Sequence, residues 1–359
     1  MSRGAGDRVD AQAIQKIVFA PVAGKLEAME GRLRADLESR GDLIGTVGVY
    51  VLGSGGKRVR PALLLLCAQA CGYADGSRPT GPADSPAPRP TGPADSPAPR
   101  DVTLAAVAEW MHVATLMHDD IIDNADKRRG RPSANATWGS NVSVLVGDYL
   151  YARSIQVLVE DGDPRILDTF ADATVRMAEG QILEHERKGK LDLSVEEYLR
   201  IIAGKTAALI SAACRAGALV AGAPPATLAA VTAFGRDLGI GFQLVDDALD
   251  YVALEERLGK PVGSDFRAGK ITYPLIHCWR EGSEADREVL RALAARPSME
   301  DADLDEVRQM VERYGAVKAT MAVVDEYLGR ARAHLAAAPD TPARRSLAFA
   351  IDFVRERDW

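Results

Sequence analysis

The chain has 359 residues, of which 47% are hydrophobic and 26% charged, and its formal net charge is −7. That length allows one large domain or two ordinary ones, and the apolar fraction is ample for a buried core. The acidic balance argues against a nucleic-acid partner, because proteins that bind nucleic acids carry a broad basic surface.

Most of the chain shows apolar residues at helical spacing, in stretches separated by short breaks rich in Gly, Pro or Asp. Strand-like alternation is scarce, so we expect an all-α fold, an antiparallel helical bundle. The expected helices cover residues 12–40, 61–72, 103–124, 141–160, 165–188, 195–221, 226–252, 285–296, 302–313, 315–338 and 342–356.

A perfect tandem repeat, Pro-Thr-Gly-Pro-Ala-Asp-Ser-Pro-Ala-Pro-Arg, occupies residues 79–89 and 90–100. Its proline content is incompatible with a helix, and it offers almost nothing to bury. We therefore predict a disordered Pro-rich insertion at about 77–100 within a single domain spanning 1–359. A proline-rich docking ligand is the alternative.

The cysteines and the apolar runs indicate a cytoplasmic protein. No His or Cys pair completes a zinc site with the four cysteines, which are expected to be buried, reduced thiols. The N-terminus lacks the pattern of a secretory signal. The apolar run at 62–68 is too short to span a bilayer, no stretch approaches the length needed, and we expect no transmembrane segment.

Two acidic clusters share one spacing: Asp119-Asp120-Ile-Ile-Asp123 and Asp246-Asp247-Ala-Leu-Asp250. On a helix, the first and last Asp of each cluster lie one turn apart on the same face, where like charges repel. A cation relieves that repulsion, and oxygen ligands without nearby His or Cys favour Mg²⁺ bridging to substrate phosphates. The alternative is a pair of solvated helix ends.

Cationic residues are concentrated in short segments. Gly53–Pro61, which contains Lys57 and Arg60, is a Gly-rich turn leading into a helix N-terminus, a favourable place for an anion. Arg128 and Arg129 follow the first acidic cluster, so both signs of charge occur at short range. A solvated loop remains the alternative for the turn, as do solvated side chains for the isolated lysines.

Taken in order, these segments resemble the all-trans polyprenyl (isoprenyl) diphosphate synthases, over nearly the whole chain outside the repeat and the first dozen residues. The motifs that carry the resemblance are Gly-Gly-Lys57-Arg58-Val-Arg60-Pro, Leu116-Met-His-Asp-Asp-Ile-Ile-Asp123, Arg128-Arg129-Gly-Arg-Pro132, Gly180-Gln181, Lys205-Thr206, Phe242-Gln243-Leu-Val-Asp-Asp-Ala-Leu-Asp250, Gly259-Lys260-Pro-Val-Gly-Ser-Asp265 and Gly269-Lys270.

The resemblance implies the isoprenoid synthase fold, with helices around a deep central cavity, and a homodimer. It implies a prenyltransferase that condenses an allylic diphosphate, farnesyl diphosphate or similar, head to tail with isopentenyl diphosphate and releases pyrophosphate. Three Mg²⁺ ions are expected with the allylic substrate bound. Transient membrane contact would serve release of an apolar product.

The resemblance also implies a role for individual residues of this sequence. Asp119 and Asp123 would bind two Mg²⁺ ions, and Asp246, with Asp247 and Asp250 near it, a third. The allylic-diphosphate contacts implied are Arg128, Lys205, Lys260, Lys270 and Gln243, with Thr206 close by. The isopentenyl-diphosphate pocket implied comprises Lys57, Arg60, His112 and Arg129. The residues expected to act in catalysis are Asp119, Asp120, Asp123, Asp246 and Lys205.

Product length should depend on the residues before the first Asp. Short-chain relatives carry a bulky aromatic four or five residues earlier, where this chain has the small Thr115 and Ala114. We therefore predict a medium- or long-chain product. The alternatives are a geranylgeranyl-length product and the catalytic subunit of a heteromeric synthase.

Three other classes fit less well. A terpene cyclase usually replaces the second acidic motif with an Asn/Ser/Glu set, and a non-catalytic partner subunit typically loses one motif, whereas both are intact here. A di-iron carboxylate bundle needs two Glu-x-x-His pairs. Only the spacing from Glu109 to His112 matches such a pair.

Overall fold

The computed structural model describes residues 18–39, 41–74, 98–252, 263–296 and 298–356. Within these ranges the regular structure is almost entirely helical, so the expected all-α fold is confirmed. A two-stranded antiparallel ladder, not expected from the sequence, pairs β1 (Lys127–Arg128) with β2 (Arg131–Pro132). The predicted insertion at about 77–100 lies mostly outside the described residues.

The elements of the first half are η1 (Ala20–Val22), α2 (Ala23–Glu38), α3 (Asp42–Gly53), α4 (Val59–Ala70), α5 (Arg100–Ile122), α6 (Ala134–Trp138), α7 (Ser140–Asp161) and α8 (Pro164–Arg187). Those of the second half are α9 (Val195–Ile202), η2 (Ala203–Ala207), α10 (Ala208–Val220), α11 (Pro225–Leu249), α13 (Ser264–Arg267), α14 (Tyr273–Glu281), α15 (Glu284–Ala294), α16 (Asp301–Arg313), α17 (Ala316–Leu335) and α18 (Pro342–Glu356).

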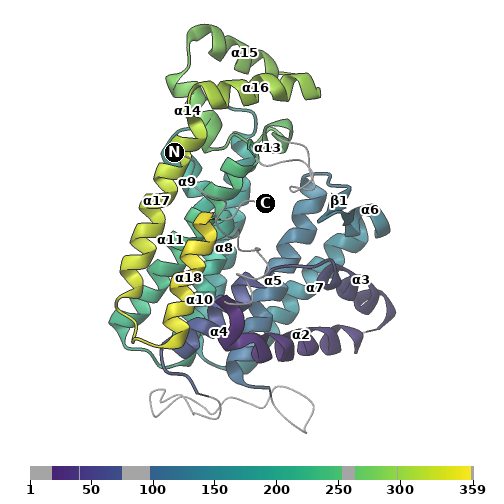
Figure 1. Cartoon of the computed structure of the whole chain (residues 1–359). Coiled ribbons are helices and arrows are strands. Elements are labelled where there is room, and N and C mark those ends of the chain that lie inside the picture. The colour runs from purple at the N-terminus through teal and green to yellow at the C-terminus, as the bar shows by residue number, and fades with distance from the viewer. Residues whose placement is uncertain (1–17, 40, 75–97, 253–262, 297, 357–359) are drawn as a thin grey trace, which may run out of the picture.

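The bundle is built on a few long helices. On one side α11 packs against α17 and α10, and on the other α5 packs against α7 and α4, while α10 joins the two sides through α4. The shorter helices α14, α15 and α16 stand together at one end of the molecule (Figure 1). One continuous apolar core runs through these elements and includes the fully buried Trp110, Phe170 and Phe234.

Several helix boundaries differ from expectation. The stretch expected at 12–40 ends at Glu38, and Gly41, with φ of 101°, separates it from α3, which was not expected. Only glycine adopts that backbone conformation readily, so the helix breaks there. The helix expected over 195–221 contains a π-helical turn, η2, in its middle. The short helix α14 was also missed.

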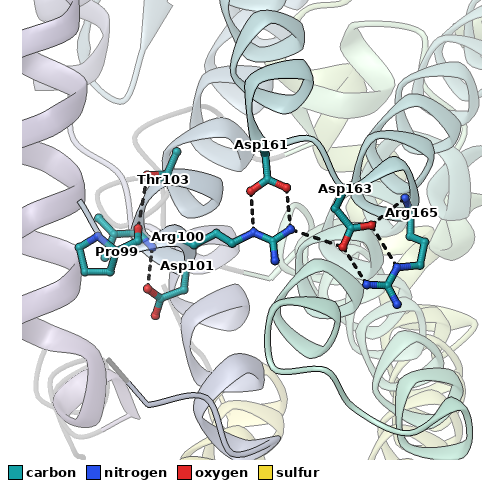
Figure 2. Close-up of polar contacts among 8 residues, drawn as sticks. Pro99, Arg100, Asp101, Thr103, Asp161, Asp163 and Arg165 are labelled. Carbon is teal, nitrogen blue, oxygen red and sulfur yellow. Dashed lines mark hydrogen bonds and ion pairs between the residues drawn. The ribbon is translucent and has the colours of Figure 1, made fainter. Parts of the chain in front are cut away.

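The last residue of the tandem repeat, Arg100, begins α5 and anchors it to the corner between α7 and α8 (Figure 2). Its guanidinium donates to both carboxylate oxygens of Asp161, at 2.6 and 2.7 Å, and to Asp163 at 3.4 Å. Asp163 caps α8 by accepting from the Arg165 backbone N–H and its guanidinium. The described chain therefore re-enters the bundle at a fixed point after the insertion.

Three described helical stretches are long and apolar enough to cross a membrane by length and composition alone: α7, Val195–Val220 and α11. The expectation that no stretch reaches this length was therefore wrong. In the two later stretches, 72% and 56% of the most apolar window is buried in the protein, so packing in the bundle accounts for their apolar character. The corresponding share in α7 is 39%.

Candidate functional site

Each acidic cluster occupies the last turn of a long helix and its C-cap. Asp123 is the C-cap of α5 and Asp250 that of α11. The C-terminus of a helix carries a partial negative charge, so carboxylates are unfavourable there unless cations compensate them. The placement predicted from the spacing is therefore observed, and it makes the need for cations stronger.

Lysines from distant segments approach the first cluster. The Lys270 ammonium donates to Asp123 at 2.9 Å across 147 residues of sequence. Burial would raise the pKa of Asp123, but Lys270 outweighs it and lowers the pKa. Burial raises the pKa of Asp119, opposed by Lys205 and reinforced by the nearby Asp123 and Glu184 carboxylates. Asp119 thus lies near other carboxylates, and a further cation would bind favourably beside it.

Asp120 points to a different partner. It is buried and accepts from the Nε and Nη2 atoms of Arg128 on β1, at 2.6 and 2.5 Å. The Asp120 carboxylate therefore fixes the Arg128 guanidinium beside the first cluster.

The second cluster is held by a chain of hydrogen bonds. The buried Asp247 accepts from the Tyr198 hydroxyl at 2.5 Å and from the Gln243 amide at 2.8 Å. The amide oxygen of Gln243 accepts from the Thr206 hydroxyl at 2.8 Å. Burial, reinforced by Asp265, raises the pKa of Asp247 to about 8. This chain ties α11 to η2 and α9.

Asp250 organises the segment that follows. Its fully buried carboxylate accepts from the Ser264 hydroxyl at 2.9 Å and from the Asp265 backbone N–H at 3.0 Å. Its role in the described structure is thus to position the start of α13. Asp246 is partly buried, and its charge opposes the lowering of the Arg60 pKa by burial.

Lys205 and Thr206 lie on the π-helical turn η2. Such turns occur often at functional sites, because the extra residue redirects side chains. Close contacts with α8 fix the turn in place: a Cβ on Gly180 would lie 2.6 Å from the Lys205 backbone N, and one on Gly204 would lie 2.6 Å from the Arg176 carbonyl. Lys205 donates to Glu184 on α8 at 2.5 Å.

One cavity of about 130 Å³ gathers five of the expected residues: Lys205, Thr206, Gln243, Asp247 and Lys270. Glu184, Tyr198 and Asp265 also line it and were not predicted as site residues. A weak signal existed for two of them, because Glu184 lies four residues after Gly180 and Asp265 belongs to a quoted motif. Tyr198 had none. Lys260 lies outside the described residues.

A second, narrower cavity of about 20 Å³, near the end of α5 and β1, is basic. Its polar lining includes Arg58, Glu109, His112, Asp120, Arg128 and Arg129. Arg58 has a φ of 49° and begins α4, and it donates to Glu30, Glu109 and the Leu52 carbonyl. It thereby connects the basic turn to α2, α3 and α5, a role that the sequence did not predict.

The remaining members of the basic group are partly buried. Burial lowers the pKa of Arg60 to about 10, and its Nε makes no hydrogen bond to any described residue. Burial and the surrounding arginines, Arg60 first, lower the pKa of His112, so its imidazole is neutral at pH 7. The Lys57 ammonium lies 5.5 Å from the centre of the Phe353 ring of α18. A buried guanidinium with a free donor favours an anionic ligand.

Among the described residues, no three His, Cys, Asp or Glu side chains are grouped closely enough to hold a metal ion by themselves. Magnesium does not require such a cage, because it keeps several waters and binds through one or two carboxylates plus phosphates. The mutually repelling Asp119 and Asp123 fit that pattern. Asp247 and Asp250 instead accept hydrogen bonds from neighbouring protein groups.

Neither residue predicted to limit product length lines the two cavities. Ala114 is fully buried in the core. The Thr115 hydroxyl donates to the His112 carbonyl at 2.7 Å, within α5 itself.

Residues 42–312 match the family described as polyprenyl synthetase. The chain is 33% identical to the octaprenyl diphosphate synthase of Escherichia coli (strain K12), covering 97% of this chain and 99% of the relative. It is 36% identical to the short chain isoprenyl diphosphate synthase of Methanothermobacter thermautotrophicus, covering 86% and 89%. It resembles the crystal structure of polyprenyl synthase from Caulobacter crescentus CB15 complexed with calcium and isoprenyl diphosphate, at a TM-score of 0.85, 33% identity and full coverage of both chains.

Proposed function

The chain belongs to the polyprenyl synthetase family and is a prenyltransferase that elongates prenyl chains, and we propose that it joins an allylic diphosphate head to tail with isopentenyl diphosphate. The single observation that carries this proposal is the convergence of Lys205, Lys270 and the first acidic cluster beside one cavity. Cations and carboxylates together suit a leaving group that gains negative charge as it departs.

The demanding step is cleavage of the bond between the allylic carbon and the diphosphate oxygen, which leaves a carbocation. Lys205 and Lys270 are placed to stabilise the charge that grows on the leaving oxygens, and fixed charges of this kind commonly provide the largest catalytic contribution. At an effective dielectric of about 20, one pair of unit charges 4 Å apart interacts by roughly 4 kcal/mol. Gln243, held by Thr206 and Asp247, is a donor of fixed orientation at the same cavity.

We propose that Asp119 and Asp123 would hold two Mg²⁺ ions when the allylic diphosphate is bound, with Asp246 on α11 contributing to a third. Bound magnesium neutralises charge on the leaving pyrophosphate. The protein's own side chains supply the remaining charge compensation. Lys270 donates to Asp123, and the Glu184 carboxylate orients Lys205.

The basic cavity is the proposed site for isopentenyl diphosphate. Arg60 offers a buried donor, Arg129 and Lys57 add positive charge, and neutral His112 can donate one hydrogen bond without adding charge. Asp120 holds Arg128 at the lining of this basic cavity. The two substrates would thus meet where α5 ends.

The proposed product is of medium or long chain, because Ala114 and Thr115 are small. A geranylgeranyl-length product is the second candidate, favoured by the similarity to the short chain isoprenyl diphosphate synthase. A catalytic subunit that requires a partner chain also remains a candidate.

We further propose a cytoplasmic homodimer that pairs through α7 and α8. Large apolar side chains are exposed on these neighbouring helices: Val144, Leu145, Ile155, Val159, Val175 and Ile182. An exposed apolar face of this extent is typical of an interface. Light scattering on the purified chain would give the mass of two chains, and the mass of one chain would contradict the proposal.

The direct test incubates the purified chain with Mg²⁺, farnesyl diphosphate and labelled isopentenyl diphosphate and identifies the products by chromatography. The proposal predicts label in all-trans products longer than the primer, one pyrophosphate released per unit added, and loss of activity with a chelator. Absence of any longer product, with every primer tested, contradicts it. Activity that appears only on adding a second protein would favour the subunit alternative.

A further inference from the structure

One buried carboxylate, Glu109, lines the basic cavity together with Arg58 and Arg129 and lies close to Arg60. Glu109 on α5 is almost fully buried, and its Oε1 accepts from Arg58 Nη1 at 2.6 Å. The Arg58 and Arg129 guanidiniums are close together: a Cβ on Gly56 would lie 3.0 Å from Arg58 Nη1 and 2.8 Å from Arg129 Nη1. Two like charges at this separation repel strongly unless an anion lies with them.

Electrostatics assigns the compensating role to Glu109. Burial works against the charged forms of Arg58, Arg60 and Arg129, and Glu109 is the foremost group that raises the pKa of each. The other nearby carboxylates have different partners or surroundings. Glu30 also binds Arg58, at 2.8 Å, but its side chain is half exposed, and Asp120 is bound to Arg128.

We infer that Glu109 is the resident counter-ion of the isopentenyl diphosphate pocket and limits how strongly that pocket binds a diphosphate. This inference rests on the proposed function of the pocket. A diphosphate and the Glu109 carboxylate interact with the same arginines, so the carboxylate repels the incoming anion while it keeps the arginines together. Glu109 also lies one helical turn before His112, on the same face of α5. It is a positioning residue that acts through the arginines.

The decisive substitution is Glu109→Gln, which keeps the size and an oxygen that accepts from Arg58 but removes the charge. We expect the KM for isopentenyl diphosphate to fall roughly fivefold, on the scale of a partly buried charge interaction. The KM for the allylic diphosphate should change less than twofold. The matched control is Glu30→Gln, the same change at the other, exposed partner of Arg58, for which both KM values should stay within about twofold of wild type.

Ligand-induced thermal shift gives a readout that does not depend on turnover. Inorganic pyrophosphate should raise the melting temperature of Glu109→Gln more than that of wild type, because the arginines gain a counter-ion they lack. An unchanged or higher KM for isopentenyl diphosphate in Glu109→Gln, with no larger shift, overturns the inference.

A second variant covers the case in which Glu109→Gln does not fold. Glu109→Asp keeps the charge but shortens the side chain, so the inference predicts a KM for isopentenyl diphosphate within about twofold of wild type. A KM raised tenfold or more would show that the contact with Arg58, and not the charge, matters, and would overturn the inference. If wild type itself consumes no isopentenyl diphosphate, the proposed function fails, whereas a wild-type enzyme with unchanged variants refutes only the role of Glu109.

Discussion

Charge compensation is specific at the level of single side chains. Asp123 has Lys270, Asp120 has Arg128, and Lys205 has Glu184, each pair bringing together residues from different elements. Asp119 is the member of the first cluster whose pKa is raised. Its environment is therefore the one that a bound cation would improve most.

Replacement of Ala114 by Phe should shorten the products, because Ala114 lies five residues before Asp119, where short-chain relatives carry a bulky aromatic. The site is fully buried, so about 1–3 kcal/mol of stability should be lost to overpacking. Chromatography of the dephosphorylated products measures the effect. The control is Ala331→Phe on α17, also fully buried, which should lose stability without changing product length. An unchanged distribution in Ala114→Phe would contradict this account of length control.

At the scale of elements, the π-helical turn η2 is the feature that places Lys205 and Thr206 at the cavity. It is held by glycine contacts with α8 and by another with α11, where a Cβ on Gly239 would lie 2.7 Å from Ala207 Cα. Backbones that approach so closely transmit any displacement directly to the side chains they carry.

Substitution Gly204→Ala should therefore reduce both stability and activity. The added methyl meets the Arg176 carbonyl at 2.6 Å, and backbone cannot move aside as a flexible side chain can. We expect a loss of about 1–3 kcal/mol in the free energy of unfolding and a fall in kcat of at least tenfold. Gly329→Ala on α17 is the control, because its Cβ would meet nothing within 4 Å, and it should be neutral or stabilising. Equal behaviour of the two variants would refute this role of the contact.

The cap of α8 makes a testable contribution to stability that depends on pH. Burial would raise the pKa of Asp163, but its bonds to Arg165 and the charge of Arg100 lower it overall. A carboxyl group with a lowered folded-state pKa stabilises the fold above its unfolded pKa of about 4, and the effect is lost as the pH falls through the folded value.

Asp163→Asn keeps an N-cap side chain but loses the charge that pairs with Arg165 and Arg100, so it should lower the free energy of unfolding by about 1 kcal/mol at pH 7. The difference from wild type should shrink below pH 4. Urea denaturation at both pH values measures it. Asp172→Asn, which removes an exposed pairing with Arg176, should change stability by less than about 0.5 kcal/mol. A difference that persists unchanged at low pH would contradict the assignment.

At the scale of the whole molecule, the described end of the tandem repeat, residues 98–100, is anchored to the bundle by Arg100 (Figure 2). Deletion of residues 79–89 leaves the second copy, and therefore Arg100 and its contacts, in place. We expect the melting temperature and kcat to stay close to wild type, because loop length changes closure entropy only slowly. A large loss of either after deletion would show that the repeat has a role in the fold or the site.

The sequence was sufficient for the fold class and for the local placement of the acidic clusters. The spacing from Asp119 to Asp123 matches helix geometry, so their placement one turn apart could be predicted, although not that the helix ends between them at Ile122. The contact of Lys270 with Asp123 could not, because its partners are 147 residues apart and no periodicity links them. The π-helical turn was missed because its apolar pattern continues that of the flanking helices. Arg58 and Glu109 were not predicted to pair, because their meeting depends on how α4 packs against α5.

The most direct test of the central claim is calorimetric titration of an unreactive thiolo analogue of the allylic diphosphate, with and without Mg²⁺. If the ends of α5 and α11 grip one metal-bound diphosphate, magnesium should strengthen binding at least tenfold in wild type. Asp119→Asn and Asp246→Asn should each lose most of that gain, and the double variant little more than the worse single one, as expected for residues acting as a unit. A magnesium effect that survives intact in Asp246→Asn would contradict the account.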